Sequence, residues 1–281
     1  MSHKGAHEIA FRTDIAPCKS GAQLRAYMQD VSGKIRETLY DDGWTKGTDK
    51  DSIATAKLSS PICCATKEPK MFRVYYLSVD NILKEVACDD GNKWYEGSMG
   101  KSKITVAPYS KLAACYLEGQ DMMLRAYCQM PDNSIQEFGY DNDKAGWKKM
   151  QSLGTAMPGT EICCTSFKMS DMSIRVYFQD MNDGIIENAT ITTGADKVGI
   201  RLFYATSNRL LEMTFDGKRW NDGNFHVNCI PGTEMSCLSW GGGNNINMRV
   251  YFQKGEQITG ISEWVWNKGT WNPERLALPP A

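Results

Sequence analysis

Arginine and glutamate recur along this 281-residue chain at nearly constant spacing, and together they could bind a neutral polyol. Each of six arginines is followed two residues later by an aromatic residue, and 48, 52, 50, 26 and 48 residues separate them in turn: Arg25, Arg73, Arg125, Arg175, Arg201 and Arg249. A glutamate follows each after 12, 12, 12, 12, 11 and 14 residues: Glu37, Glu85, Glu137, Glu187, Glu212 and Glu263. A guanidinium offers a fork of hydrogen-bond donors and a carboxylate offers two acceptors, so the pair matches vicinal hydroxyls.

Aromatic, Gly-rich segments follow the glutamate in four of the units and contain Trp44, Trp94, Trp147 and Trp220, whereas the last unit ends through Trp266 and Trp271. An indole face beside the polar pair could cover the apolar C–H or methyl patch of a sugar. The structural alternative is an Arg–Glu pair across each hairpin, which would stabilise it by about 0.2–1 kcal/mol. Six occurrences near aromatic residues favour sugar binding over structural pairing alone.

The elements that carry these residues repeat about every fifty residues. A strand of small residues such as 111–115 precedes the arginine strand, a turn signal follows, and then come the glutamate strand and the aromatic segment. Four short strands per repeat are typical of propeller blades, and no segment shows a sustained helical period. The sequence therefore predicts an all-β fold, a six-bladed β-propeller of four-stranded antiparallel blades that forms a single domain over residues 1–281.

One repeat is too short. Only 26 residues separate Arg175 from Arg201, and the tract 187–192 runs almost directly into the next arginine strand without an aromatic, Gly-rich segment. We therefore expect a truncated junction between the fourth and fifth blades.

An enzyme is not expected. A glycosidase needs two carboxyl groups that face each other across the scissile bond. Each unit offers one recurring glutamate, and the adjacent arginine should lower its pKa and make it a poor general acid. The aspartates that follow the glutamate strand lie beside Gly and Asn, and we expect them to form turns: Asp41, Asp89, Asp141 and Asp216. A scaffold for other proteins and, less favoured, a sialidase-like glycosidase remain the alternatives.

Charge, apolar runs and cysteine placement limit the classes of partner and the cellular locations that we expect. A net charge of −1, from 32 basic and 33 acidic residues, leaves no basic excess for nucleic acid, and the apolar runs are too short for membrane insertion. The adjacent pairs Cys63-Cys64 and Cys163-Cys164 are predicted to be packing residues, because neighbours on a strand point to opposite faces. No metal or cofactor is expected. Residues 1–8 lack the apolar stretch of a secretory signal, which favours the cytosol or unconventional export to the cell or spore surface.

The chain resembles the fungal fucose-binding lectins of the Aleuria aurantia type over nearly its whole length. The phrases that carry the resemblance are Arg25-Ala26-Tyr27-Met28-Gln29-Asp30, Asp80-Asn81-Ile82-Leu83-Lys84-Glu85, Val106-Ala107-Pro108-Tyr109-Ser110 and Ser262-Glu263-Trp264-Val265-Trp266-Asn267. The resemblance implies a six-bladed propeller that binds L-fucose and fucosylated glycans or glycoproteins, without metal, in clefts between neighbouring blades. Several clefts on one ring, or on a homodimer of rings, would add avidity.

The resemblance also implies the membership of each cleft, the Arg and Glu of one blade with aromatic residues of the next. In chain order the clefts are Arg25 and Glu37 with Trp94; Arg73 and Glu85 with Tyr140 and Trp147; Arg125 and Glu137; Arg175 and Glu187 with Phe215 and Trp220; Arg201 and Glu212 with Trp266 and Trp271; and Arg249 and Glu263 with Tyr40 and Trp44. The first has Cys88 where the family often has Tyr. The aromatic partners of the third fall in the missing half-blade, so we expect it to be weak or inactive.

Overall fold

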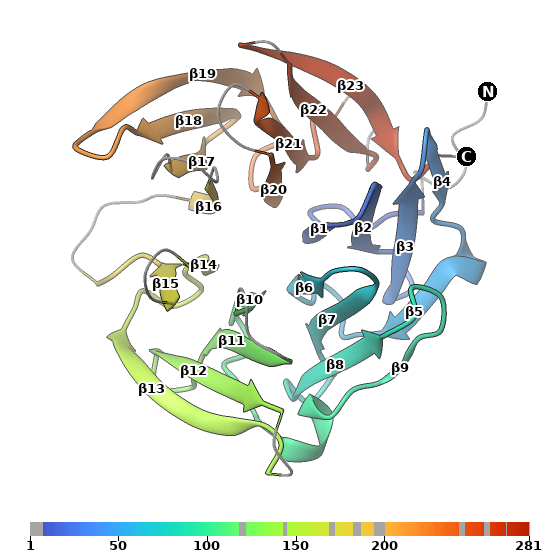
Figure 1. The fold of residues 1–281 in the computed structure, drawn as a ribbon, viewed down its shortest axis with the longest axis vertical. Coiled ribbons are helices and arrows are strands. Elements are labelled where there is room, and N and C mark those ends of the chain that lie inside the picture. The colour runs from blue at the N-terminus through green and yellow to red at the C-terminus, as the bar shows by residue number, and fades with distance from the viewer. Residues whose placement is uncertain are drawn as a thin grey trace.

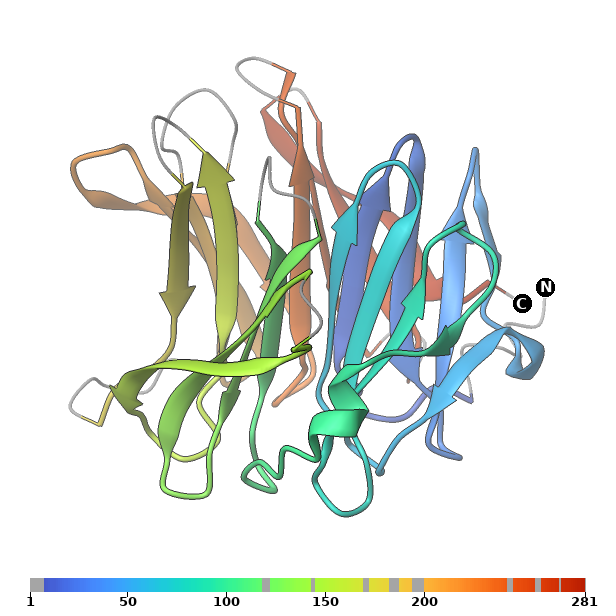
Figure 2. The same ribbon diagram turned by 60° about the horizontal axis from the view of Figure 1, so that its bottom comes forward.

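The computed structural model shows six antiparallel sheets arranged in chain order as a ring (Figure 1). It describes residues 8–117, 122–142, 145–168, 172–181, 187–193, 200–241, 245–255, 259–267 and 269–280, without the side chains of 187–193 and 276. Each sheet turns one edge toward the central channel, and the innermost strands of neighbouring sheets contact one another. Figure 2 shows these inner strands running along the depth of the ring. No helix in the described part of the chain is long and apolar enough to cross a membrane.

The first three blades have the predicted order, from a small-residue inner strand to an aromatic outer segment. The first contains β1 (Ile15–Ser20), β2 (Gln23–Gln29), β3 (Lys34–Tyr40), β4 (Trp44–Lys46), the 3-10 turn η1 (Asp49–Asp51) and β5 (Ser52–Thr55), which pairs with β3. The second contains β6 (Ile62–Lys67), β7 (Met71–Leu77), β8 (Leu83–Cys88), β9 (Tyr95–Glu96) and η2 (Met99–Ser102). The third contains β10 (Leu112–Tyr116), β11 (Met123–Gln129), β12 (Ser134–Asp141) and β13 (Lys148–Thr155).

The other half of the ring contains the predicted truncation, which falls at the fourth sheet. This sheet has two strands, β14 (Cys163–Lys168) and β15 (Met172–Tyr177). The fifth blade contains β16 (Glu187–Thr193), β17 (Ile200–Thr206), β18 (Arg209–Phe215) and β19 (Trp220–Asn228). The sixth contains β20 (Met235–Trp240), β21 (Asn247–Phe252), β22 (Ile261–Asn267) and β23 (Thr270–Leu278).

The residues of the short repeat that follow β15 therefore belong to the fifth blade, as its strand β16. The prediction that Glu187 faces Arg175 across a hairpin is wrong, because β16 pairs with β17, with Glu187 opposite Ala205 and Thr192 opposite Arg201. The physical reason is that β17 needs a partner along its inner edge, since unpaired backbone groups in a sheet interior are costly. Six sheets form the ring, but five rather than six have four or more strands.

Side chains that alternate between the two faces of the arginine strands form the packing between blades. Arg and the aromatic residue two positions later lie on the same face of the strand, because side chains alternate with a period of two. Phe203 of the fifth blade is fully buried at this position. The tyrosines at the same position in other blades are almost fully buried as well: Tyr27, Tyr75, Tyr127 and Tyr251. They contribute to separate apolar clusters that join neighbouring blades. The same alternation thus places each arginine beside a junction between blades.

The ring closes between the sixth and first blades, where the N- and C-termini lie at the same edge (Figure 1). Gln253, at the end of the sixth arginine strand, is fully buried. Its amide donates to the carbonyls of Ala10 at 3.1 Å and Thr259 at 2.8 Å, and its oxygen accepts from the backbone N–H of Arg12 at 2.6 Å. Gln29 joins the first blade to Lys57 in the same manner. These glutamines fasten adjacent blades through buried hydrogen bonds.

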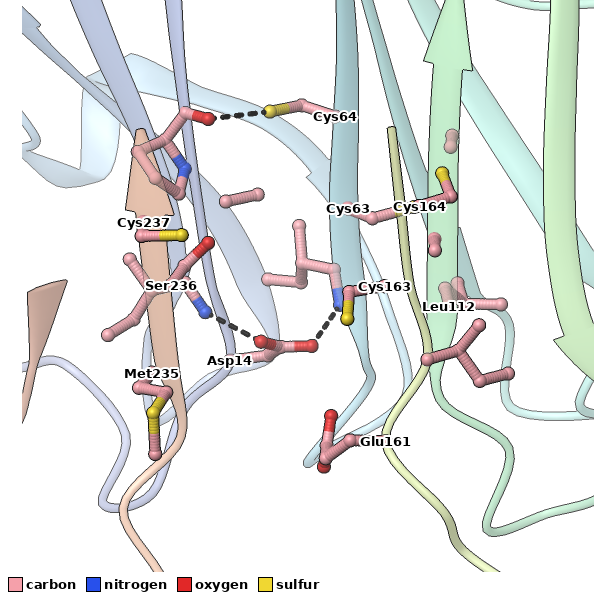
Figure 3. Close-up of a pocket in the computed structure, with 17 residues that line it drawn as sticks. Asp14, Cys63, Cys64, Leu112, Glu161, Cys163, Cys164, Met235, Ser236 and Cys237 are labelled. Carbon is pink, nitrogen blue, oxygen red and sulfur yellow. Dashed lines mark hydrogen bonds between the residues drawn. The ribbon is translucent and has the colours of Figure 1, made fainter. Parts of the chain in front are cut away.

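The central channel contains a cavity of about 150 Å³ lined by the inner strands (Figure 3). Cys63, Cys64, Cys163 and Cys164 line it, and all ten cysteines are free thiols. The adjacent cysteines do not bridge, as predicted. The Cys64 thiol instead donates to the carbonyl of Pro17 at 3.2 Å.

Carboxyl groups gather around one ammonium group at the channel. Lys111 Nζ lies 2.8 Å from Glu161 Oε1 and 2.6 Å from Glu234 Oε1. Asp14 accepts from the backbone N–H groups of Ile15 and Ile62, both at 2.9 Å. Burial raises the pKa of Glu161 to about 8, although Lys111 opposes the shift, and burial likewise raises the pKa of Asp14 to about 6.

These raised pKa values predict a pH-dependent stability. Between about pH 4.5 and pH 8 the folded protein holds a proton on Glu161 that the unfolded chain releases, so this residue's contribution to stability falls as the pH rises through that window. We expect Glu161→Gln to flatten the decline of Tm between pH 5 and pH 8. Thermal melts of the two proteins across this range measure the difference, and parallel Tm curves would contradict the assignment.

Candidate ligand-binding clefts

The hairpin register places arginine and glutamate as diagonal neighbours on one face. In the first blade Arg25 lies opposite Leu39, and Glu37 lies opposite Tyr27. The second, third, fifth and sixth blades repeat this arrangement. The N–O separations are 2.7 Å for Arg25–Glu37, 3.7 Å for Arg73–Glu85 and 3.1 Å for Arg125–Glu137, and Arg201–Glu212 and Arg249–Glu263 are direct ion pairs as well. The tyrosine hydroxyl opposite the glutamate adds a hydrogen bond in three blades, from Tyr27, Tyr75 and Tyr251.

The second cleft is an open cavity of about 340 Å³ between the second and third blades. It is lined by Arg73 and Glu85 from one blade and by Tyr140 and Trp147 from the next, so the structure brings all four predicted residues together. The two rings lie 5.7 Å apart between centroids, at 47° to each other. The cavity thus joins a polar pair to an aromatic wall, and its volume lies within the ~300–1,000 Å³ typical of ligand pockets.

Further residues line the second cleft that the sequence analysis did not predict as members of the site. Asp89 and Tyr95 from the same blade line the cavity, as do Met122 and Leu124 from the third blade. Tyr95 directly follows Trp94 in the aromatic segment, so its place beside a predicted aromatic residue was a usable signal. Met122 directly precedes β11 and follows no repeated pattern, whereas Leu124 lies in β11 and is the apolar residue that precedes the repeated arginine.

The role predicted for Asp89 and Asp141 is wrong. Asp89 Oδ1 lies 2.8 Å from Arg73 Nη2, and Asp141 Oδ1 lies 2.7 Å from Arg125 Nη1. These carboxylates are therefore second partners of the arginines, because the end of the glutamate strand returns beside the guanidinium. Asp216 does form a turn, in which its carboxylate accepts from the backbone N–H groups of Lys218 and Arg219.

The electrostatics of the second cleft also differ from the expectation. Burial raises the pKa of Glu85, against the lowering effects of the Met99 N–H and of Arg73, and burial likewise raises the pKa of Glu137. The predicted lowering by arginine is thus outweighed by desolvation in both residues. The pKa of Asp89 is lowered, since hydrogen bonds from Tyr95 and Arg73 overcome its own burial.

Glycine lets the chain pass close to the glutamate in two blades. A Cβ added to Gly97 would lie 2.3 Å from Glu85 Oε2, and one added to Gly223 would lie 2.4 Å from Glu212 Cγ. We therefore expect Gly97→Ala to displace Glu85 and weaken ligand binding in the second cleft by about tenfold or more, and Gly223→Ala to act in the same way on the fifth. Titration calorimetry of each variant checks this, and unchanged binding in both would contradict it.

The fifth and sixth clefts contain their predicted aromatic residues. Trp271 donates its indole N–H to Glu212 Oε2 at 3.2 Å, and Trp266 lies 4.9 Å from the Arg201 guanidinium. In the sixth cleft, Trp44 donates to Glu263 Oε2 at 2.8 Å, and the ring of Tyr40 lies 4.8 Å from the Arg249 guanidinium. An indole N–H from the next blade therefore orients the glutamate, and a second aromatic residue covers the arginine.

The first cleft has the predicted members in a closed arrangement. Trp94 packs edge-on against Tyr27 at 5.7 Å, beneath the pair of Arg25 and Glu37. The guanidinium lies 4.1 Å from the ring of Phe72, and both charged side chains are only 4% exposed.

The third and fourth clefts lack a complete set. Arg125 and Glu137 form an ion pair, but the strands β14 and β15 that face them contain no tryptophan. Arg175 is exposed on β15, whereas Phe215 and Trp220 pack together at 5.3 Å in the next blade. The side chain of Glu187 lies outside the described residues. Weak or absent binding in the third cleft, and binding in the fourth, stay predictions.

A metal centre has no support in the described ranges, where no group of three or more His, Cys, Asp and Glu side chains could hold a metal ion. The chemistry that the clefts offer is hydrogen bonding to hydroxyls and packing against aromatic rings. Such a ring of sheets with repeated cation, carboxylate and indole groups defines a β-propeller with polar and aromatic clefts between its blades.

Comparison with known proteins identifies the family. The family model described as fungal fucose-specific lectin matches residues 9–194 and 188–281. The fucose-specific lectin of Aspergillus fumigatus is 39% identical over 317 aligned positions that cover all of both chains, and that of Aleuria aurantia is 32% identical over 263 residues, covering 90% of this chain and 72% of the relative. This chain therefore belongs to the fungal fucose-specific lectin family.

Solved structures agree with the fold. The SapL1 lectin in complex with alpha methyl fucoside superimposes with a TM-score of 0.89 at 34% identity, covering 99% of this chain and 100% of that one. The six-bladed β-propeller of the Aleuria aurantia lectin has a TM-score of 0.52 at 30% identity, covering 95% and 80%.

The same comparisons show that this chain is shorter than the alignment and is matched by the family model in two parts. The alignment with the Aspergillus fumigatus relative has 36 more positions than this chain has residues. The two matches to the family model overlap at 188–194, which includes most of β16. This overlap therefore lies at the start of the fifth blade, directly after the two-stranded fourth sheet.

Proposed function

We propose that this protein binds L-fucose and fucosylated glycans in clefts between its blades, as a lectin without catalytic activity. The observation that carries the proposal is the second cleft, where Arg73, Glu85 and Asp89 line one side of a cavity and Tyr140 and Trp147 line another. The names of the relatives and the fucoside complex of SapL1 support the same ligand.

The cleft matches the chemistry of a deoxyhexose. The Arg73 guanidinium supplies donors, and the carboxylates of Glu85 and Asp89 supply acceptors, so adjacent hydroxyls can each donate and accept. The methyl group of fucose needs an apolar surface, which Met122, Leu124 and Trp147 provide. Specificity for fucose over a hexose would follow from this apolar wall, because a hydroxymethyl group there would lose hydrogen bonds to water.

Several clefts on one rigid ring would raise the avidity for glycan-coated surfaces. A dimer of rings would add to this number and is part of the proposal. The protein would meet such surfaces after unconventional export, or would act within the cytosol.

Retention on fucose-agarose tests the proposal. We expect the protein to bind the resin and to elute with free L-fucose but not with an equal concentration of galactose. Passage through the resin without retention would favour a protein-binding scaffold instead. Release of free fucose from a fucosylated oligosaccharide would favour a glycosidase and contradict the lectin assignment.

A further inference from the structure

The two terminal nitrogens of Arg25 and both carboxylate oxygens of Glu37 in the first cleft are already bound by the chain itself. Arg25 Nη1 binds Glu37 Oε2 at 2.7 Å, and Arg25 Nη2 donates to the backbone carbonyl of Gly91 at 2.6 Å. Lys46 Nζ lies 3.1 Å from the other oxygen of Glu37. The face of the guanidinium packs on Phe72 at 4.1 Å. The side chains of Arg25 and Glu37 are each 4% exposed, much as Arg73 and Glu85 are at 6% and 3%, so the bond to the Gly91 carbonyl rather than burial distinguishes the first cleft.

In the fifth and sixth clefts, an aromatic residue from the glutamate strand of the next blade covers the arginine. The residue three positions after the glutamate is Tyr40 in the first blade and Trp266 in the sixth, and each ring lies within 5 Å of the arginine of the preceding blade. Tyr140 and Phe215 hold the same position in the glutamate strands of the third and fifth blades. The second blade has Cys88 at this place. A thiol is much smaller than an aromatic ring, so it leaves space above Arg25.

The loop that follows Cys88 fills that space. Asp90 Oδ1 accepts from the backbone N–H groups of Asn92 and Lys93, both at 2.8 Å, and lies 3.5 Å from the Cys88 thiol. Gly91 has a φ of +79°, a conformation that glycine adopts without strain, and this turn directs its carbonyl to Arg25. The loop is thus held by its own hydrogen bonds in a shape that caps the cleft.

We propose that the first cleft is closed by its own chain and binds no fucose, with the Gly91 carbonyl in the place of a ligand hydroxyl. The inference rests on the proposed function, since it concerns which clefts are available to the sugar. Its cause is Cys88, which lies where the first, third, fifth and sixth blades have an aromatic residue. An aromatic side chain at position 88 would exclude the loop and provide the missing wall.

Counting binding sites tests the inference. Titration calorimetry with methyl α-L-fucoside gives the number of sites per chain for the unaltered protein, for Arg25→Met and for Cys88→Tyr. We expect Arg25→Met to leave the number unchanged, because the cleft is closed, and Cys88→Tyr to raise it by one. Arg25→Met retains the Lys46–Glu37 ion pair and needs no new packing, so it tests the inference even if Cys88→Tyr fails to fold.

The outcomes separate this inference from the proposed function. Loss of one site in Arg25→Met would overturn the closed cleft while leaving the lectin assignment intact. The absence of any fucoside binding by the unaltered protein would instead overturn the proposed function. A gain of one site in Cys88→Tyr that Arg25→Met abolishes in the double variant would establish that the new site is the first cleft.

Discussion

Arg73→Ala should remove one fucose-binding site and leave the others unchanged. Arg73 is the cation of the second cleft, and two carboxylates converge on it, Glu85 at 3.7 Å and Asp89 at 2.8 Å. Without it the cleft loses its fork of donors and presents two acidic groups to a neutral sugar. Because Arg73 lowers the pKa of Glu85 against the effect of burial, its loss should raise that pKa further.

The same substitution should destabilise the protein by about 3–5 kcal/mol, the usual cost of leaving one member of a buried ion pair without its partner. Titration calorimetry with methyl α-L-fucoside measures the number of sites, and urea denaturation measures the free energy of unfolding. Arg219→Ala is the matched control, since Arg219 is 80% exposed and lies 3.8 Å from Asp216 on the surface. An unchanged number of sites in a folded Arg73→Ala protein would contradict the assignment of the cleft.

Gln253→Ala should weaken the closure of the ring and lower the free energy of unfolding by about 2–4 kcal/mol. The substitution leaves the carbonyls of Ala10 and Thr259 and the N–H of Arg12 without the partner that now satisfies them, and each such buried group costs about 1–3 kcal/mol. Some of this cost is recovered where water enters the space, which keeps the expected loss below the sum of the separate penalties.

Chemical denaturation of Gln253→Ala measures this loss. Gln151→Ala provides the control, because Gln151 is exposed on β13 and its truncation should change stability by less than about 0.5 kcal/mol. Equal effects of the two substitutions would show that Gln253 does not fasten the sixth blade to the first.

Much of the site was predictable because it is built from local structure. Arginine and glutamate are separated by 11 to 14 residues across a turn, and this spacing sets the register of the hairpin. Strand alternation then places arginine, tyrosine and glutamate on one face. The partners across each junction came from the resemblance to the family. The structure brings Trp147 to Arg73, Trp266 to Arg201 and Tyr40 to Arg249.

The repeat in the sequence by itself determined the all-β ring, its order and the pairing of arginine with glutamate in five blades, since these follow from strand period and turn position. Only the tertiary structure decided three other matters. Residues 187–193 joined the fifth blade because β17 needs an inner partner, and Asp89 turned back to Arg73. Gly91 closed the first cleft because the small thiol of Cys88 leaves room for it. All three depend on contacts between different segments competing for the same space or the same hydrogen bonds, and residue spacing does not encode that competition.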